Sequence, residues 1–196
     1  MAILVAGGAG YIGSHTALEL LEKKEDVIYL DNLTKGHKDA VMGGKFYQVD
    51  LLDTEALRKV FRENEIEAVI DFAAFSLVGE SVNEPIKYYQ NNVGATINLL
   101  KVMQEAGTKK IVFSSTAATY GEPANVPILE SDRTEPTNPY GETKLAVEKA
   151  LKWADRAYGI KYVSLRYFNA AGAHISGKIG EDHTPETHLI PLILDA

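Results

Sequence analysis

Short apolar runs alternate with longer amphipathic stretches along this chain, and that alternation constrains the fold more than any other feature. Six runs have the length and the β-branched or aromatic content of strands: residues 2–7, 26–30, 45–49, 68–73, 110–115 and 161–168. Helices are predicted between them, near residues 11–24, 53–64, 85–106 and 140–158. Because strands joined by helical crossovers pair in parallel, the pattern predicts an α/β fold, a doubly wound parallel sheet with helices on both faces.

The two longest predicted helices carry apolar residues at helical spacing, which places them on one face of each helix. In residues 85–106 they are Ile86, Tyr89, Val93, Ile97, Leu100 and Met103. In residues 140–158 they are Val147, Leu151, Ala154 and Tyr158. Either face could cover the sheet. The apolar run at residues 189–196 is also expected to be helical.

Composition limits the functions that the chain can have. It has 196 residues, of which 45% are hydrophobic, and this is enough for one well-packed domain. A net charge of −7 argues against a nucleic-acid surface. The absence of cysteine excludes disulfides and thiolate metal sites. The N-terminal stretch has no basic leader and no apolar run of membrane-spanning length, so a cytoplasmic protein without a membrane partner is expected.

The first predicted strand ends in a glycine-rich turn, "GGAGYIGSH", that leads into the first helix. Gly7 permits a tight turn, Gly10 lets a phosphate approach the backbone, and Gly13 lets the helix pack close to the sheet. The free amides at that end of the helix attract anionic oxygens, such as those of a dinucleotide pyrophosphate. Such a turn alone is weak evidence, but the strand before it and the helix after it favour a Rossmann-like dinucleotide site over a simple turn.

Asp31, at the end of the second predicted strand, indicates which dinucleotide would bind. A carboxylate there accepts hydrogen bonds from both hydroxyls of the adenosine ribose and repels a 2′-phosphate. The following stretch "DNLTKGHK" offers Lys35 and Lys38 but no arginine for such a phosphate. The sequence therefore predicts NAD rather than NADP, although Asp31 could also be a residue that ends a strand at a turn. Asp50 ends the third predicted strand, where it could bond the adenine amino group.

Tyr140 and Lys144 lie four residues apart where the fourth helix is predicted to begin, so both fall on one helix face. For an isolated pair, a surface stack is the simpler interpretation. Together with "GGAGYIG", Asp31 and "FSSTAATYG" (113–121), however, the motif "PYGETK" (139–144) resembles the extended short-chain dehydrogenase/reductase family. The resemblance has the right order and spacing of motifs and covers essentially the whole chain.

Within that family the chain is most similar to the N-terminal part of the UDP-glucose 4-epimerases. Three longer segments carry this similarity: residues 78–100, 166–174 and 180–191. The resemblance implies NAD-dependent epimerisation of a nucleotide sugar at C4, with UDP-glucose or UDP-galactose as substrate. NAD would accept a hydride from the sugar transiently, so the same cofactor molecule should stay bound from one cycle to the next.

The resemblance also implies that Tyr140, Lys144 and Thr116 are the catalytic residues. Free tyrosine titrates near pH ~10, so it is a poor base at neutral pH. Positive charge from Lys144 and from the nicotinamide ring is predicted to lower the pKa of Tyr140, which could then remove the proton of a sugar hydroxyl. Lys144 is also expected to hold the nicotinamide ribose, and Thr116 to bond the reacting oxygen.

Other positions match the family's cofactor and substrate contacts one by one. The cofactor contacts implied, besides the catalytic three, are Gly7, Gly10, Tyr11, Ile12, Gly13, Asp31, Asn32, Leu33, Thr34, Lys35, Gly36, Asp50, Leu51, Phe72, Ala73, Ala74, Phe75, Ser76, Asn91 and Phe168. The substrate contacts implied are Thr116, Tyr140, Asn169, His188 and Leu189. Outside the resemblance, Asn91 would be a polar residue within a helix and His188 an ordinary surface histidine. The remaining histidines show no metal-ligand spacing, so no metal site is predicted: His15, His37, His174 and His183.

Alternative functions stay open at this point. Related dehydratases carry an Asp–Glu pair where this chain has Ala117 and Ala118, and alanine cannot protonate a leaving hydroxyl, which disfavours dehydration. Decarboxylation of a nucleotide sugar is a further reaction of the family. A different class is an NAD-binding module with little or no turnover, because the family's epimerases are longer than this chain.

The expected domain organisation follows from the same resemblance. Residues 1–168 would form the NAD-binding Rossmann domain, and residues 169–196 the start of a truncated substrate-binding region. Either the chain is a truncated piece or it is a naturally short form. In the resembled family, the helices that correspond to residues 85–106 and 140–158 form a homodimer interface, although their apolar faces could equally cover the sheet.

Overall fold

The computed structural model describes residues 1–184, 186–194 and 196. Its strands are β1 (Ala2–Ala6), β2 (Val27–Asp31), β3 (Lys45–Gln48), β4 (Ile66–Asp71), β5 (Lys110–Thr116) and β6 (Lys161–Tyr167). Its α-helices are α1 (Tyr11–Glu22), α2 (Thr54–Glu63), α3 (Val78–Asn83), α4 (Pro85–Tyr88), α5 (Ala95–Ala106), α6 (Pro139–Tyr158) and α7 (Leu189–Leu194). Shorter helical segments are η1 (Lys38–Ala40), the π-helical η2 (Tyr89–Gly94) and η3 (Ala117–Thr119). All six predicted strands are confirmed, with ends that differ by at most two residues.

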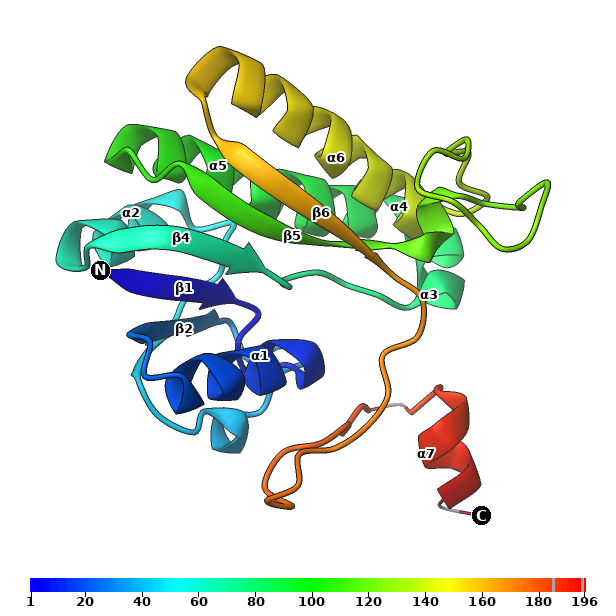
Figure 1. The fold of residues 1–196 in the computed structure, drawn as a ribbon, viewed down its shortest axis with the longest axis horizontal. Coiled ribbons are helices and arrows are strands. Elements are labelled where there is room, and N and C mark those ends of the chain that lie inside the picture. Colours follow the sequence, from blue (N-terminus) through cyan, green and yellow to red (C-terminus); the bar gives the residue numbers. More distant parts are fainter. Residues whose placement is uncertain (185, 195) are drawn as a thin grey trace.

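The strands form one parallel sheet in the order β3-β2-β1-β4-β5-β6 (Figure 1). From β1 the chain builds outward to β3, returns across the sheet to β4, and then builds outward in the other direction. This topology confirms the predicted doubly wound sheet. The building direction reverses between β1 and β4, and α/β proteins bind ligands beyond the carboxyl ends of the strands at such a point.

Helices cover the two faces of the sheet unequally. Leu4 and Ala6 of β1 point into the larger core cluster, which α2, α5 and α6 complete from one face. Val5 points the other way, into a smaller cluster that includes Ala17 of α1. At the β6 edge, the face opposite α6 leaves Val163 and Leu165 exposed (53% and 39%). The described chain therefore covers one face fully and the other mainly near β1 and β2.

Residues 85–106 are helical throughout, as predicted, but a π-helical turn interrupts the α-helix. The structure has α4, η2 and α5 in succession, and α3 precedes them without having been predicted. Leu100 and Met103 are buried as expected, but Ile86, Tyr89 and Ile97 are exposed. A π-helical turn holds more residues than an α-helical turn, so it rotates the residues before it relative to those after it. A single 3.6-residue period therefore cannot describe the whole segment.

Helix α6 begins and ends as its sequence indicates. The Asn138 side chain accepts a hydrogen bond from the Gly141 amide (2.9 Å), Pro139 occupies the first turn, and Gly159 ends the helix with a φ of 70°. Val147, Leu151 and Ala154 are buried as predicted, whereas Tyr158 is exposed. This cap fixes the first turn of α6 at the carboxyl end of β5.

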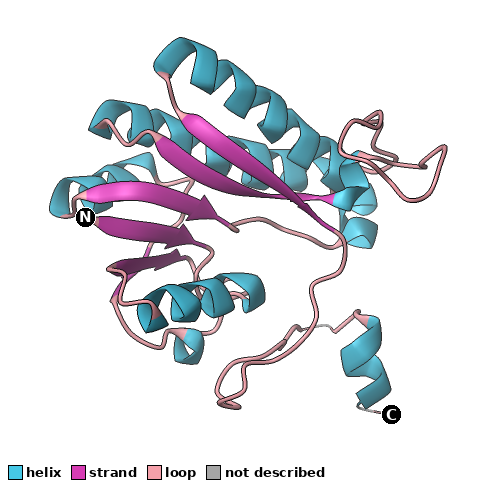
Figure 2. Cartoon of the chain, viewed as in Figure 1, coloured by secondary structure: helices cyan, strands magenta, loops and turns pink. Residues whose placement is uncertain are grey.

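After β6, the chain crosses back to the first half of the sheet as a return segment, residues 168–188 (Figure 1, orange to red). The described residues of the return segment form neither helix nor strand, and α7 follows directly after it (Figure 2). Its attachments include hydrogen bonds from Tyr11 Oη to the Gly172 carbonyl (2.6 Å), from Lys35 Nζ to the Thr184 carbonyl (3.1 Å) and from His37 Nε2 to the Asp182 carbonyl (2.9 Å). Among the described helices, none has both the length and the apolar character needed to cross a membrane.

Candidate active site

Two adjoining cavities follow the carboxyl ends of the strands. Both are lined by Gly7, Gly10, Lys35, Phe72, Ala74 and Phe75. The smaller, of about 110 Å³, lies over β1, β2 and β4. The larger, of about 690 Å³, extends from the glycine turn to the ends of β5 and β6 and to the return segment. The two cavities form one continuous cleft at the predicted position.

The glycine turn is held by close backbone contacts. Gly7 has a φ of +70°, and a Cβ placed on it would lie 2.8 Å from the Ala73 amide nitrogen. A Cβ on Gly13 would lie 2.1 Å from the Gly7 carbonyl oxygen. A Cβ on Gly10 would approach only that same oxygen, at 3.4 Å, so the turn stays open on its outer side. At Gly7 and Gly13 the surrounding backbone therefore leaves no room for a side chain.

The N-terminus of α1 follows this turn with free donors. The first helical hydrogen bond runs from the Ser14 amide to the Gly10 carbonyl (2.9 Å). The amides of Tyr11 and Ile12 precede it, and amides at these positions point out of the helix end. Because both residues line the larger cavity, the helix presents donors and a positive dipole end to an anion there.

Asp31 and Asp50 lie together on the smaller cavity. The buried Asp31 carboxylate accepts hydrogen bonds from the amides of Ala9 (3.0 Å) and Leu33 (2.8 Å). Asp50 accepts from the side chain of Asn32 (2.9 Å) and from the Leu52 amide (2.8 Å). A carboxylate oxygen can accept further hydrogen bonds, so both groups remain able to bind hydroxyl or amino donors of a ligand.

Tyr140, Thr116 and Lys144 line the larger cavity from α6 and the end of β5. Burial raises the pKa of Tyr140, and a hydrogen bond with the Thr116 side chain partly counteracts this. Lys144 is only 3% exposed and donates to the Ser114 carbonyl (2.8 Å), with its Nζ 6.0 Å from the centre of the Tyr140 ring. The structure brings the predicted catalytic residues together. Burial of the phenol therefore opposes the predicted lowering of the Tyr140 pKa.

Sequence reasoning missed Asp71, which ends β4 and is 1% exposed. Its carboxylate accepts from the Ala73 amide (3.1 Å) and the Thr96 hydroxyl (3.2 Å). Burial raises the pKa of Asp71 to about 6, against the lowering effect of Lys144. Burial likewise lowers the pKa of Lys144 to about 8, against the raising effect of Asp71. A carboxylate at the end of a central strand was the available signal, the same one that identified Asp31.

Two further buried polar residues support the site. Asn92 bonds the backbone of Phe75 through both ends of its amide (2.8 and 3.0 Å) and donates to Thr143 of α6 (3.2 Å). Ser81 of α3 accepts from the Tyr140 amide (3.2 Å). These contacts connect α6 to the loop after β4. Neither residue was predicted, because Asn92 lies in the π-helical segment and α3 was not foreseen.

Most of the other predicted site residues line the cleft. The smaller cavity is lined by Asn32, Thr34, Lys35, Gly36, Leu51, Phe72, Ala73, Ala74, Phe75 and Asn91. The larger is lined by Gly13, Ser76, Phe168, Asn169 and His188. In the described part of the chain, Leu33 and Leu189 line neither cavity. Leu33 contributes only its amide, to Asp31, and Leu189 is exposed in α7.

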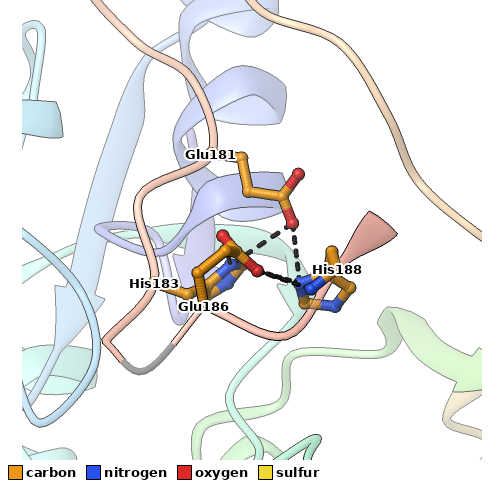
Figure 3. Close-up of side chains that lie close together, drawn as sticks. All are labelled: Glu181, His183, Glu186 and His188. Atoms are coloured by element: carbon orange, nitrogen blue, oxygen red, sulfur yellow. Dashed lines mark hydrogen bonds and ion pairs between the residues drawn. The ribbon is translucent and has the colours of Figure 1, made fainter. Parts of the chain in front are cut away.

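One group of potential metal ligands occurs in the described part of the chain: Glu181, His183, Glu186 and His188 (Figure 3). One nitrogen or oxygen atom of each lies within 4.8 Å of the others. Histidine spacing alone does not reveal this group, because two of its four members are glutamates. The pattern E-x-H-x-x-E-x-H is the signal that would have found it.

Comparisons with known proteins agree with this geometry. The family model described as NAD dependent epimerase/dehydratase family matches residues 3–196. The UDP-glucose 4-epimerase of Halalkalibacterium halodurans is 64% identical over 194 residues, 99% of this chain and 58% of that protein. The UDP-glucose 4-epimerase of Streptococcus mutans is 60% identical over 197 residues, 99% of this chain and 59% of that protein.

Solved structures show the same partial coverage. A crystal structure of a UDP-glucose 4-epimerase superposes with a TM-score of 0.98 at 54% identity, covering 99% of this chain and 59% of that one. The UDP-glucose 4-epimerase from Brucella ovis in complex with NAD has a TM-score of 0.96 at 50% identity, covering 97% and 59%. This chain therefore spans slightly less than three fifths of the length of these relatives.

Proposed function

The chain belongs to the NAD dependent epimerase/dehydratase family, and from that premise we propose that it binds NAD and epimerises UDP-glucose and UDP-galactose at C4. One observation carries the proposal: Thr116, Tyr140 and Lys144 line the same 690 Å³ cavity as the glycine turn. A dinucleotide held at that turn and a sugar held against Tyr140 would share this space. The relatives named UDP-glucose 4-epimerase support the choice of substrate.

The residues around the cleft fit NAD. The turn at Gly10 and the amides of Tyr11 and Ile12 suit its pyrophosphate, and the Asp31 carboxylate suits the ribose hydroxyls of its adenosine half. Asp50 and Asn91 line the smaller cavity, where the adenosine half would lie. When bound, NAD⁺ supplies the acceptor for the hydride on the reacting sugar carbon and a positive ring beside Tyr140.

Tyr140 is the residue that we propose moves the proton. Its hydroxyl would take the proton of the sugar C4 hydroxyl and return it to the same oxygen when the inverted configuration forms. Burial opposes ionisation of the phenol, so nearby positive charge is needed for Tyr140 to act as a base. Lys144 is one such charge, and Thr116 orients the phenol and the sugar oxygen by hydrogen bonding.

Dehydration fits the cleft less well. Ala117 and Ala118 line the larger cavity beside Thr116, at the positions where the related dehydratases carry an acid pair. Neither alanine can protonate a leaving hydroxyl. This difference favours a reaction in which one residue, Tyr140, both removes and returns the proton.

A second candidate, NAD binding with little turnover, is favoured by the partial coverage of the relatives. We propose that residues 1–168 form the cofactor domain and that residues 169–196 begin a substrate-binding region. Enzymes use binding energy from remote parts of a substrate to position the reacting centre. If the chain lacks ~4–7 kcal/mol of contacts to the uridine diphosphate, turnover falls by several powers of ten, at ~1.4 kcal/mol per tenfold. We expect tight NAD binding and weak epimerase activity from these 196 residues alone.

Incubation with UDP-galactose and detection of UDP-glucose tests the proposal. Tyr140→Phe is the control for background conversion. A chimaera that joins this chain to the remaining length of the Halalkalibacterium halodurans relative should turn over much faster than the chain alone. Conversion that survives in Tyr140→Phe would overturn the assignment of the base, and a chimaera with no activity but normal NAD binding would favour the binding module.

We also infer a homodimer through α4, η2, α5 and α6. Ile86, Tyr89, Ile97 and Trp153 of these elements are exposed apolar side chains, and clustered apolar surface favours association. Light scattering on the purified chain tests this inference. A Trp153→Glu variant should shift a dimer to monomer, and a wild-type chain that is monomeric at high concentration would refute the inference.

A further inference from the structure

We propose that Glu181, His183, Glu186 and His188 form a four-ligand zinc site that fixes the return segment at the mouth of the cleft. The proposal rests on the juxtaposition of two imidazole nitrogens and two carboxylates in the described loop between β6 and α7 (Figure 3). It does not depend on the reaction proposed above, although Glu181, His183 and His188 line the same larger cavity and His188 is also an expected substrate contact.

The two His183 distances match those in a tetrahedral site, and the two His188 distances are about half an ångström shorter. The His188 Nδ1 lies 2.9 Å from Glu181 Oε1 and 2.8 Å from Glu186 Oε1. The His183 Nδ1 lies 3.3 Å from Glu181 Oε1 and 3.5 Å from Glu186 Oε2. Zinc–ligand bonds of ~2.0–2.2 Å in tetrahedral geometry place ligand atoms roughly 3.3–3.5 Å apart. Small movements of side chains already in place would therefore complete the site.

The Nδ1 of His183 supplies independent support. This atom is buried and has no hydrogen-bond partner among the described residues. It nevertheless faces the carboxylates of Glu181 and Glu186 at the distances given above. Buried polar atoms in proteins almost always have a partner. A metal ion between Nδ1 and the two carboxylates would provide one.

The donor set indicates which metal would bind. Two imidazoles and two carboxylates suit Zn²⁺, whereas Mg²⁺ and Ca²⁺ take oxygen ligands. The two negative charges would balance the charge of the ion. Glu186 Oε1 also accepts hydrogen bonds from the amides of Thr187 and His188 (both 2.7 Å), which orients this carboxylate before any ion arrives.

The position of the cluster indicates a structural role. The His183 ring lies edge-on to the Tyr11 ring, with centres 6.2 Å apart, next to the glycine turn. Thr184 accepts a hydrogen bond from Lys35, and Asp182 shares one with His37. Four protein ligands leave no open position for a substrate or water, as in structural zinc sites. The ion would join the two ends of the 181–188 loop where that loop borders the cleft.

The competing interpretation is a network of ion pairs in which the histidines are protonated and bind no metal. Zinc and cobalt titrations distinguish the two. The full chain, without an affinity tag, is stripped with a chelator and titrated with ZnCl₂ in a competitive indicator assay. We expect one Zn²⁺ per chain, and CoCl₂ should give the strong visible absorption of tetrahedral Co²⁺ rather than the weak absorption of octahedral Co²⁺.

Matched variants locate the site. His183→Ala and Glu186→Gln should weaken Zn²⁺ binding by about 100-fold or more, because even outer-shell partners of metal ligands contribute 10–100-fold. His174→Ala removes a histidine outside the cluster and should bind like the wild type. Glu186→Gln preserves size and backbone contacts, so with an unchanged circular dichroism spectrum its loss of binding reports the ligand and not the fold. Equal binding by His183→Ala and the wild type, an octahedral cobalt spectrum, or no zinc binding by the wild type would each overturn the proposal.

Discussion

Replacing Asp71 with asparagine should change how stability depends on pH, because it removes the anion that helps Lys144 keep its proton inside the protein. Asp71 and Lys144 are 1% and 3% exposed, so each depends on the other for charge compensation. The Asp71 carboxylate raises the pKa of Lys144, while burial lowers it to about 8 overall. Asparagine keeps the shape and can keep the hydrogen bonds to Ala73 and Thr96, but it cannot supply the charge.

The free energy of unfolding rises with pH wherever the unfolded chain binds more protons than the folded one. In the wild type the folded pKa of Lys144 lies below its unfolded value, so the unfolded chain binds the extra proton between about pH 8 and 10.5, and stability rises with pH only there. Asp71 has a raised pKa of about 6, so its contribution falls as pH rises through 6. Between pH 6 and 8 the small fall from Asp71 and the small rise from Lys144 nearly cancel, so the pair leaves wild-type stability roughly constant.

In Asp71→Asn the pKa of Lys144 should move below 8, so that folding releases a proton in the neutral range. Stability of the variant should then rise with pH by up to ~1.4 kcal/mol per pH unit. Over the two units from pH 6 to 8, the difference between the variant and the wild type should change by up to ~2.7 kcal/mol in favour of the variant, the full amount if the variant's Lys144 pKa falls below 6.

Urea denaturation followed by far-UV circular dichroism at pH 6, 7 and 8 measures this difference. Glu122→Gln removes an exposed carboxylate and should run parallel to the wild type. If Asp71→Asn also runs parallel to the wild type within ~0.5 kcal/mol, then Asp71 and Lys144 are not coupled as described.

Three further outcomes are expected. Tyr140→Phe should abolish epimerisation, measured in the chimaera described above, while calorimetry shows unchanged NAD affinity, because only the titrating oxygen is lost; weaker NAD binding would give Tyr140 a cofactor role instead. Calorimetry should show tighter binding of NAD than of NADP. Asp31→Ser should weaken NAD binding and reduce the ratio of the two affinities, since the carboxylate both binds the ribose and repels a 2′-phosphate. An unchanged ratio would mean that Asp31 has another role. Gly13→Ala should lower the melting temperature and weaken NAD binding, because its Cβ would lie 2.1 Å from the Gly7 oxygen; wild-type values would show that the turn can relax.

The sheet could be predicted because its signal is local. Each strand is a short apolar run that ends at a turn or a helix start, and the six runs are all strands in the structure. The direction in which each side chain of the 85–106 helix points could not be predicted in the same way. The π-helical η2 changes the rotation between Ile86 and Leu100, and nothing in the composition indicates it. A periodicity analysis assumes one repeat throughout, and here two repeats meet.

Much of the candidate site was also predictable, because it is built from motifs whose members are close in sequence or end neighbouring strands. Gly7, Asp31 and Tyr140 line the cleft as expected. Asp71 and Asn92 could not be assigned with the same ease, since their partners Lys144 and Thr143 are distant in sequence and meet them only in the folded chain. The direction of the Tyr140 pKa shift depends on burial, which a spacing of four residues does not reveal.

The return segment has a consequence for the order in which the protein assembles. Tyr11, His37 and Lys35 bond residues 161, 145 and 149 positions further along the chain. Contacts of such long sequence separation form only after much loop entropy has been lost, so we expect them late in folding. They are also few and exposed. Amides of residues 170–184 should therefore exchange with deuterium through local opening within a short labelling time, whereas those of β1 and β4 should exchange only on global unfolding.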